Sequence, residues 1–395
     1  METYKFLMDL ALILLSTKLF GLITKKFNMP QVVGALLAGL LLGPAIFNIL
    51  NETEFIISLS EVGVIVLMFT AGLESDISEL KKTGKASFII ALCGVIFPLI
   101  GGFVVAYIFN RPGIQGSDTS SSIMLQNIFI GVILTATSVS ITVETLKEMG
   151  KLSTNVGNAI LGAAIIDDIL GIIALTIITS TADDSVNITV VLLKILAFFI
   201  CTAVIGFLFF KIFKKITDRY KRDMRRFVIL AFVFCLLMAY CSEVFFGVAD
   251  ITGAYMAGLI LSNSKYAKYI LNRFEVVSYV LLSPIFFASI GLKVVIPKMT
   301  LSIILFSVLL VVIAVLTKVI GCGLSAKACS FNNKESLQIG VGMVSRGEVA
   351  LIVASKGASI GLMSSALFGP IIIVVVVTTI ISPILLKMAF KTTGA

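Results

Sequence analysis

Long apolar stretches separated by short polar or charged breaks run along the whole chain. Most of these stretches reach the roughly 20 residues that a helix needs to cross the hydrocarbon core of a bilayer. The ninth, 250–263, is shorter and can cross only if it is tilted or partly buried in protein. The pattern predicts an all-α polytopic membrane protein with about thirteen transmembrane helices, at 6–24, 30–49, 55–73, 86–109, 123–146, 156–180, 188–210, 227–247, 250–263, 274–295, 300–325, 336–360 and 364–386.

The composition agrees with a membrane protein. Of 395 residues, 58% are apolar, and 31 Lys and Arg face only 22 Asp and Glu. A water-soluble enzyme or nucleic-acid module could not bury so much apolar surface, so both classes are excluded. The chain has no His, which removes the usual zinc ligand and the commonest general base, and none of its six cysteines forms a C-x-x-C motif. We therefore expect no catalytic residues, no enzymatic activity and no cofactor.

The basic residues indicate how the chain crosses the membrane. Loops on one side hold 22 Lys and Arg, and loops on the other side hold five. The positive-inside rule then predicts an external N-terminus and a cytoplasmic C-terminus in a bacterial plasma membrane. Asp9 and Lys18 interrupt the first apolar stretch, so we expect a membrane span there and not a cleavable signal. The formal charge of +9 reflects this topology and does not indicate nucleic-acid binding.

Two pairs of segments share an offset of 219 residues. Residues 32–44 and 251–263 are identical at six of thirteen positions, and Gly72-Leu73 matches Gly291-Leu292 at the same offset. The two members of each pair are seven spans apart, an odd number, so the second copy must cross in the opposite direction. This predicts an inverted repeat, an architecture in which secondary transporters bind their cargo near the midplane between interrupted helices.

Two spans contain residues that interrupt a helix. TATSVS at 135–140 is polar and β-branched, and GVGMVSRGEVA at 340–350 combines three glycines with Arg346 and Glu348. Both segments weaken a helix and leave backbone groups in need of partners. They also lie seven spans apart, as a pair of crossing discontinuous helices requires. We expect Arg346 and Glu348 to have a structural or supporting role at the second interruption.

Adjacent acids, Asp167 and Asp168, lie near the centre of the sixth span. Ionised carboxylates at this depth are costly and are functional in most membrane proteins. Neighbours on a helix point about 100° apart, so one acid can bind a fixed cation while the other faces a water-filled cavity. The alternative is that both acids form structural ion pairs or cap a broken helix.

Lys318 in the eleventh span is the candidate partner for one acid. Such a pair can release or take up a proton when it breaks, because isolation in a low dielectric favours the neutral form of each group. The alternative is that Lys318 extends toward the membrane surface. A carboxylate without a fixed cation can bind either a proton or a hard metal ion through oxygen ligands, and this competition already produces exchange.

Five segments of the chain resemble those of a known family. They are LGAAIIDDILGIIAL (161–175), TATSVSITVETLKEMG (135–150), IGVGMVSRGEVALIVASKG (339–357), SPIFFASIGLKV (283–294) and FTAGLESDISELK (69–81). They are similar to bacterial cation/proton antiporters of the second monovalent-cation branch, of the NapA and GerN types. Relatives that act as glutathione-gated K⁺ efflux systems carry Gln-Asp instead of Asp-Asp and a nucleotide-binding domain, so the resemblance points away from them.

The resemblance implies a fold with a mobile core domain and a dimerisation domain. The scaffold would comprise 1–85 and 227–295, and the core 86–180 and 300–388, with 188–226 as a linker helix and cytoplasmic loop. The core would contain the crossed discontinuous helices and move as an elevator within a homodimer. The lipid bilayer, a monovalent cation and the proton are the partners that the resemblance implies.

The resemblance also implies a role for each site residue. Asp168 would be the main Na⁺ ligand, Asp167 would pair with Lys318, and Thr137 and Ser138 would lie beside the ion. Glu348 would occupy a supporting acidic position. The Asp-Asp/Lys combination resembles the electrogenic members of the family, which move more protons than cations in each cycle.

The sequence therefore predicts a secondary antiporter that exchanges cytoplasmic Na⁺ for external protons, with Li⁺ and K⁺ as further candidate cations. One alternative is a Na⁺-coupled symporter of organic anions with a similar fold. Another is a cation channel or a sensory membrane component. A primary ATP-driven pump is disfavoured because the chain has no phosphate-binding G-x-x-x-x-G-K-[ST] loop.

Overall fold

The fold is helical throughout the part of the chain that the computed structural model describes. Ten helical segments in this part are long and apolar enough to cross a membrane. The predicted all-α membrane fold is therefore confirmed. The described residues are 4–27, 29–109, 121–182, 187–219, 224–295, 301–359, 361–364 and 367–391.

Each of the thirteen predicted stretches overlaps one helix or consecutive helical segments, but the helix in the second stretch, 30–49, covers only Gln31–Leu42. Two π-helical segments, η2 (Ser242–Phe246) and η3 (Ser278–Leu282), continue α9 and join α11 to α12. The helices are α1 (Lys5–Lys26), α2 (Gln31–Leu42), α3 (Glu54–Glu74), α4 (Ile77–Phe109), α5 (Ile123–Thr135), α6 (Val139–Glu148), α7 (Asn155–Ala182), α8 (Ile188–Arg219), α9 (Met224–Cys241), α10 (Asp250–Ser262), α11 (Ala267–Val277), α12 (Ser283–Leu292), α13 (Leu301–Ala328), α14 (Asn333–Gly342), α15 (Glu348–Ser359) and α16 (Phe368–Lys391).

Both predicted interruptions are present. The fifth span divides into α5 and α6, with three residues between Thr135 and Val139 outside the helices. The twelfth span divides into α14 and α15, between Gly342 and Glu348. Polar β-branched residues at the first break and glycines at the second offer the backbone little helical propensity, so the chain leaves the helix there. The freed backbone groups are then available to bind other groups.

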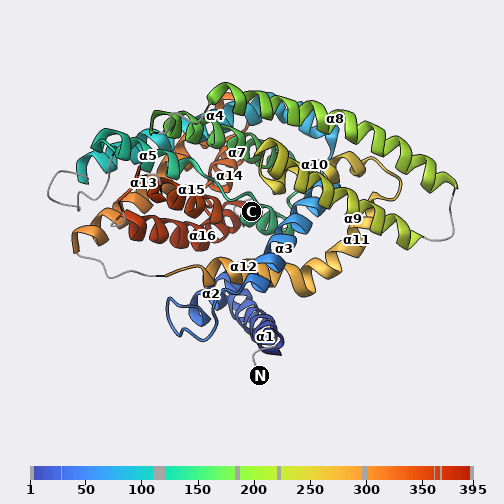
Figure 1. Ribbon diagram of the computed structural model, residues 1–395, viewed down its shortest axis with the longest axis horizontal. Helices are drawn as coiled ribbons and strands as arrows, with labels where there is room; N and C mark the ends of the chain where they lie inside the picture. The colour runs from blue at the N-terminus through green and yellow to red at the C-terminus, as the bar shows by residue number, and fades with distance from the viewer. Residues whose placement is uncertain are drawn as a thin grey trace.

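The helices pack in two groups that Figure 1 shows side by side. In the first group α4 packs against α5, α7 and α13, and α13 packs against α14 and α16. In the second group α3 packs against α10, α11 and α12, and α2 packs against α1 and α12. Helix α6 contacts both groups, because it packs against α7 and α16 and also against α2 and α3.

Glycines allow the closest approaches in the second group. A Cβ atom at Gly39 of α2 would lie 2.0 Å from a carbonyl oxygen of α12, and one at Gly258 of α10 would lie 2.2 Å from a carbonyl oxygen of α3. On the facing helices, Gly291 meets α2 and Gly72 meets α10. Gly39 and Gly258 are separated by the 219 residues that also separate Gly72 and Gly291. Equivalent positions of the two sequence segments thus make equivalent contacts.

The short α10 crosses this group with most of its surface covered. Eight of its thirteen residues are buried, and it packs against α3 and α9. Because neighbouring helices cover α10, the polar backbone groups at its ends are shielded from lipid, and a helix too short to span the bilayer can lie there. Of the two possibilities for the ninth stretch, a tilted helix or one partly buried in protein, the structure shows burial in protein.

Candidate functional site

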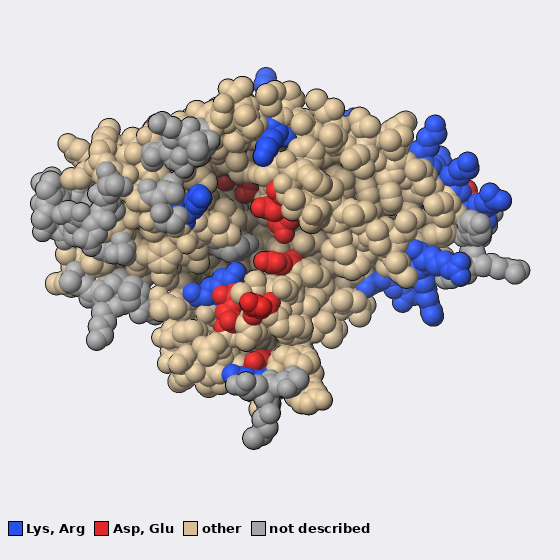
Figure 2. Space-filling model, in the orientation of Figure 1, with Lys and Arg blue, Asp and Glu red and all other residues tan. Residues whose placement is uncertain are grey.

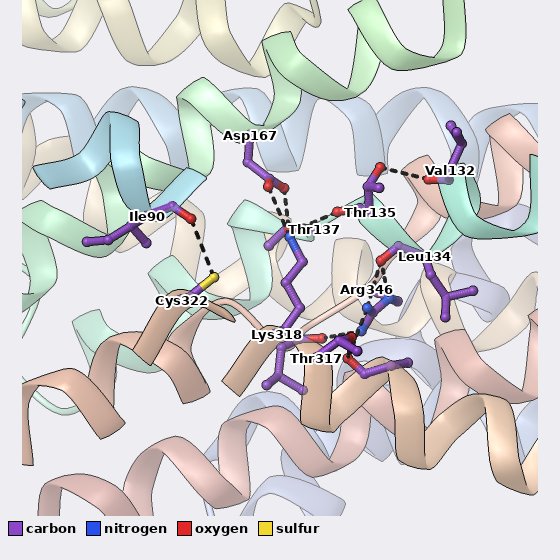
Figure 3. A network of polar contacts seen from close by, with 12 residues as sticks. Ile90, Val132, Leu134, Thr135, Thr137, Asp167, Thr317, Lys318, Cys322 and Arg346 are labelled. Atoms are coloured by element: carbon purple, nitrogen blue, oxygen red, sulfur yellow. Dashed lines mark hydrogen bonds and ion pairs between the residues drawn. The ribbon is translucent and has the colours of Figure 1, made fainter. Parts of the chain in front are cut away.

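A buried ion pair connects α7 to α13 in the middle of the first helix group. The Nζ atom of Lys318 donates to both carboxylate oxygens of Asp167, at 3.0 and 3.1 Å. The exposed fractions of the two side chains are 0% and 1%. Figure 3 shows the two side chains pointing toward each other. Since the ammonium of Lys318 is fully buried on Asp167, this side chain does not extend toward the membrane surface.

Helix α4 covers this ion pair. A Cβ atom at Gly94 would lie 3.3 Å from Oδ1 of Asp167 and 3.5 Å from Nζ of Lys318. The Sγ atom of Cys322, one turn beyond Lys318, donates to the carbonyl oxygen of Ile90 at 3.7 Å. The absence of a side chain at Gly94 therefore leaves the space that the pair occupies. Sequence reasoning did not single out Gly94, because a glycine in an apolar span carries no chemical signal of its own.

The second acid, Asp168, lies in a different environment. Asp167 is 2% exposed, whereas Asp168 on the next position of α7 is half-buried. Successive residues of a helix point about 100° apart, and the carboxylate of Asp167 is the one seen to bind Lys318. The arrangement therefore contains one neutralised acid and one acid that is more accessible.

The two interruptions lie against each other and exchange hydrogen bonds. The backbone N–H of Ser138 donates to the carbonyl oxygen of Ser345, and the Ser345 hydroxyl donates to the carbonyl oxygen of Ser138, both at 2.8 Å. The hydroxyl of Thr142 lies 2.8 Å from the Ser345 hydroxyl and 2.8 Å from the carbonyl oxygen of Gly342. These bonds give partners to some of the backbone N–H and C=O groups that lack helical hydrogen bonds at the interruptions. Ser345 was not identified from the sequence, although it lies inside the predicted break.

Arg346 donates hydrogen bonds to further backbone carbonyl groups at the interruptions. It is 1% exposed, and its guanidinium donates to the carbonyl oxygens of Leu134, Ala314 and Val344. The carbonyl oxygen of Arg346 itself accepts a hydrogen bond from the Thr379 hydroxyl. The structure therefore places this arginine at the second interruption, in contact with the end of α5 and with α13.

The remaining predicted residues lie at the same two breaks. Thr137 and Ser138 are both 2% exposed, and the hydroxyl of Thr137 donates to the carbonyl oxygen of Thr135 at 3.4 Å. Glu348 begins α15, and its side chain lies outside the part that the structure describes. Within the described residues, no group of three or more His, Cys, Asp or Glu side chains is arranged to hold a metal ion. A cation here would depend on one carboxylate with hydroxyl and carbonyl oxygens.

A cavity of about 680 Å³ opens between α1, α2, α6 and the segment from α11 to α12. Figure 2 shows acidic side chains gathered where the surface is hollowed between the two helix groups. The sequence analysis did not identify the acids of this cavity. Glu144 falls within a predicted span and could have been found by the argument applied to Asp167. The charged residues that line the cavity are Lys18, Glu144, Lys147, Glu148 and Glu275.

Comparison with known proteins agrees with this architecture. The family model of transmembrane sodium/hydrogen exchangers matches residues 11–392. The chain is 40% identical over 388 residues to the Na⁺/H⁺-K⁺ antiporter GerN of Bacillus cereus, covering 98% of this chain and 97% of that protein. It is 35% identical over 391 residues to a Na⁺/H⁺ antiporter of Enterococcus hirae, covering 98% of each chain.

A solved structure has the same fold. The sodium proton antiporter MjNhaP1 from Methanocaldococcus jannaschii superposes with a TM-score of 0.73 at 19% identity, covering 100% of this chain and 99% of that chain. The predicted likeness to bacterial cation/proton antiporters is thus confirmed by sequence relatives, and the likeness in fold by this structure. The chain is an integral membrane protein and belongs to the family of transmembrane sodium/hydrogen exchangers.

Proposed function

We propose that this protein is a secondary active antiporter that exchanges Na⁺ for protons across a bacterial plasma membrane. The observation that carries the proposal is the buried pair of Asp167 and Lys318 beside the half-buried Asp168. Relatives that match nearly the whole chain are named Na⁺/H⁺ antiporters, and one of them is also named for K⁺. Na⁺ is therefore the first cation to test, and Li⁺ and K⁺ follow.

In this mechanism Asp168 carries the exchange. Its carboxylate binds either a proton or a desolvated alkali ion, and occupation by one excludes the other. Thr137 and Ser138 lie at the first interruption, where hydroxyl and carbonyl oxygens suit a hard monovalent cation. Glu348 and Arg346 support the second interruption. No cofactor takes part, and the transported ions are the substrates.

The pair of Asp167 and Lys318 is the second proton carrier. A buried pair is stable only while both charges are present, so a change of proton number on either partner separates them. Protonation of Asp167 or deprotonation of Lys318 then accompanies the binding or release of the cation. More protons than cations move in each cycle, and transport is electrogenic.

Access alternates by movement of one helix group against the other. The proposed core comprises 86–180 and 300–388, and the proposed scaffold comprises 1–85 and 227–295, with 188–226 as a linker. The equivalent contacts of Gly39 with α12 and of Gly258 with α3 support an inverted repeat. The scaffold forms a homodimer, the N-terminus lies outside, and the C-terminus is cytoplasmic.

The test is exchange in proteoliposomes with an imposed pH gradient, comparing Na⁺, Li⁺ and K⁺ across pH. We expect Asp168→Asn to abolish cation-dependent proton movement. The amide of Asn is neutral, so it cannot take up a proton and has no negative charge to bind an alkali ion. Asp76→Asn is the matched control, since Asp76 is exposed at the start of α4 and accepts a hydrogen bond from the backbone N–H of Ser78. Na⁺-dependent exchange that persists in Asp168→Asn would refute the assignment.

The role of Lys318 has its own measurement. Lys318→Gln removes the proton that this residue carries, so we expect weaker voltage dependence or a shifted pH profile. Solid-supported membrane currents per transported Na⁺ distinguish these outcomes from a simple loss of protein. A current per Na⁺ identical to that of the unmodified protein would contradict the proton-carrying role. Solute-dependent Na⁺ uptake would instead indicate a symporter, and currents without stoichiometric proton movement would indicate a channel.

A further inference from the structure

Lys147 near the end of α6 contacts two acids on the second helix group. Its Nζ atom lies 3.6 Å from Oε1 of Glu74 on α3 and 3.5 Å from Oε1 of Glu275 on α11. It also donates to the hydroxyl of Thr70 on α3 at 3.2 Å. One ammonium group therefore bridges α6 to two different helices.

The next residue makes a third connection. Oε2 of Glu148 accepts a hydrogen bond at 2.7 Å from the backbone N–H of Gln31, the first residue of α2. The N-terminus of a helix carries a partial positive charge, so a carboxylate is favourable there. The C-terminal turn of α6 is thus bound to α2, α3 and α11, all of which belong to the second group.

The opposite end of α6 belongs to the candidate site. Helix α6 begins at Val139, directly after Ser138, and Thr142 in its first turn contacts Ser345 and Gly342 of the other interruption. One short helix of ten residues therefore joins the crossed interruptions at one end to the second helix group at the other end. A relative movement of the two groups must change the contacts of Lys147 and Glu148.

Exposure separates this cluster from the buried pair of the site. The side chains of Lys147, Glu74 and Glu275 are 18%, 20% and 41% exposed, and Lys147 and Glu275 line the cavity, whereas Asp167 and Lys318 are fully buried. Partly exposed ion pairs separate at small cost because water solvates both charges, but separation of a buried pair leaves unsolvated charges. The Lys147 contacts can therefore form and break repeatedly within a transport cycle.

We propose that Lys147, with Glu74 and Glu275, forms a releasable lock between α6 and the second helix group. The lock stabilises the conformation seen here, and its opening is a step in the movement of the two groups. Lys18 on the other wall of the cavity does not replace Lys147, because its ammonium donates to the hydroxyl of Tyr279 and lies 4.1 Å from the centre of that ring. This inference rests on the proposed function only in assuming that the two groups move.

A reversible cross-link tests the lock directly. Lys147→Cys combined with Glu275→Cys is joined by a reducible bifunctional thiol reagent in proteoliposomes, and Na⁺/H⁺ exchange is measured before and after reduction. We expect the cross-link to reduce exchange about tenfold or more, because it prevents the movement that limits turnover, and reduction to restore it. Exchange at an unchanged rate in protein shown by mass spectrometry to be cross-linked would overturn the proposal.

The chain offers a matched control for this experiment. Glu79 and Lys82 form an ion pair at 2.7 Å within α4, so Glu79→Cys combined with Lys82→Cys accepts the same reagent without joining the two groups. We expect this cross-link to leave exchange unchanged. Treatment of the protein that carries only its six own cysteines measures any effect of the reagent on those residues.

Hydrogen–deuterium exchange tests the lock without transport. Lys147→Gln removes the bridge, so backbone amides of α6 and α11 should exchange about threefold faster or more than in Lys82→Gln, which loses only a surface pair. Equal protection in the two variants would overturn the lock even if antiport is intact. Absence of Na⁺/H⁺ exchange in the unmodified protein would instead refute the proposed function. The comparison of amide exchange rates would still test the lock, because it does not depend on transport.

Discussion

The guanidinium of Arg346 closes the end of α5 through the carbonyl oxygen of Leu134, with Nη2 at 2.7 Å and Nε at 3.2 Å. The same group donates to Ala314, which lies one turn before Lys318 on α13. The C-terminal carbonyls of a helix carry a partial negative charge that a cation stabilises. A residue of one interruption therefore ends the helix of the other and fixes the helix that carries Lys318.

Arg346→Met should destabilise the protein strongly. The substitution leaves the carbonyl oxygens of Leu134, Ala314 and Val344 without this donor in a buried site, and we expect the free energy of unfolding to fall by about 3 kcal/mol or more. Chemical denaturation in detergent measures it. Lys327→Met, at an exposed position of α13, is the control and should change stability by less than about 0.5 kcal/mol. Equal losses in both variants would contradict the capping role.

The buried ion pair should show strong coupling in a double-mutant cycle. Lys318→Met or Asp167→Asn alone removes one partner of a fully buried pair and should cost about 3–5 kcal/mol of unfolding free energy. The double variant buries no uncompensated charge, so it should lose less than the sum of the single variants. Denaturation of all four proteins under one condition gives the coupling energy. Strictly additive losses would show that the two groups do not stabilise each other.

Ser345→Ala tests the contact between the interruptions. It removes the donor to the carbonyl oxygen of Ser138 and the bond to Thr142, and we expect a loss of about 1–2 kcal/mol. Ser382→Ala is the matched control, because the Ser382 hydroxyl is buried and has no hydrogen-bond partner among the described residues. Removing an unpaired buried hydroxyl should be neutral or slightly stabilising. A larger loss for Ser382→Ala than for Ser345→Ala would reverse this assignment.

Gly39→Ala should separate α2 from α12. Its Cβ atom would lie 2.0 Å from the carbonyl oxygen of Ala288, so one backbone must move, and we expect a loss of about 1–3 kcal/mol. Gly84→Ala on α4 meets nothing within 4 Å and should be neutral or stabilising by up to about 1 kcal/mol. The melting temperatures of the two variants and of the unmodified protein in detergent measure these changes in stability. A melting temperature unchanged by Gly39→Ala would show that the helices pack less closely there than described.

Local chemistry in the sequence was sufficient for the helices and their interruptions. Membrane spans depend on the hydropathy of about 20 consecutive residues, and breaks depend on glycine and on polar β-branched residues in a short window. For that reason the helical stretches and the breaks at 135–140 and 340–350 could be predicted. The length of the ninth stretch left two possibilities, a tilted helix or one partly buried in protein.

Only the tertiary structure decided which groups meet. The family resemblance implied that Asp167 pairs with Lys318, but the residues by themselves left the choice between Asp167 and Asp168 open. The two partners are 151 residues apart, and which acid faces Lys318 depends on how α4, α7 and α13 pack, because the acids point about 100° apart. The bridge from Lys147 to α3 and α11 likewise joins helices that no local pattern connects. Hydrophobicity acts within a span, whereas ion pairs and hydrogen bonds between spans depend on rotations and approaches that packing alone determines.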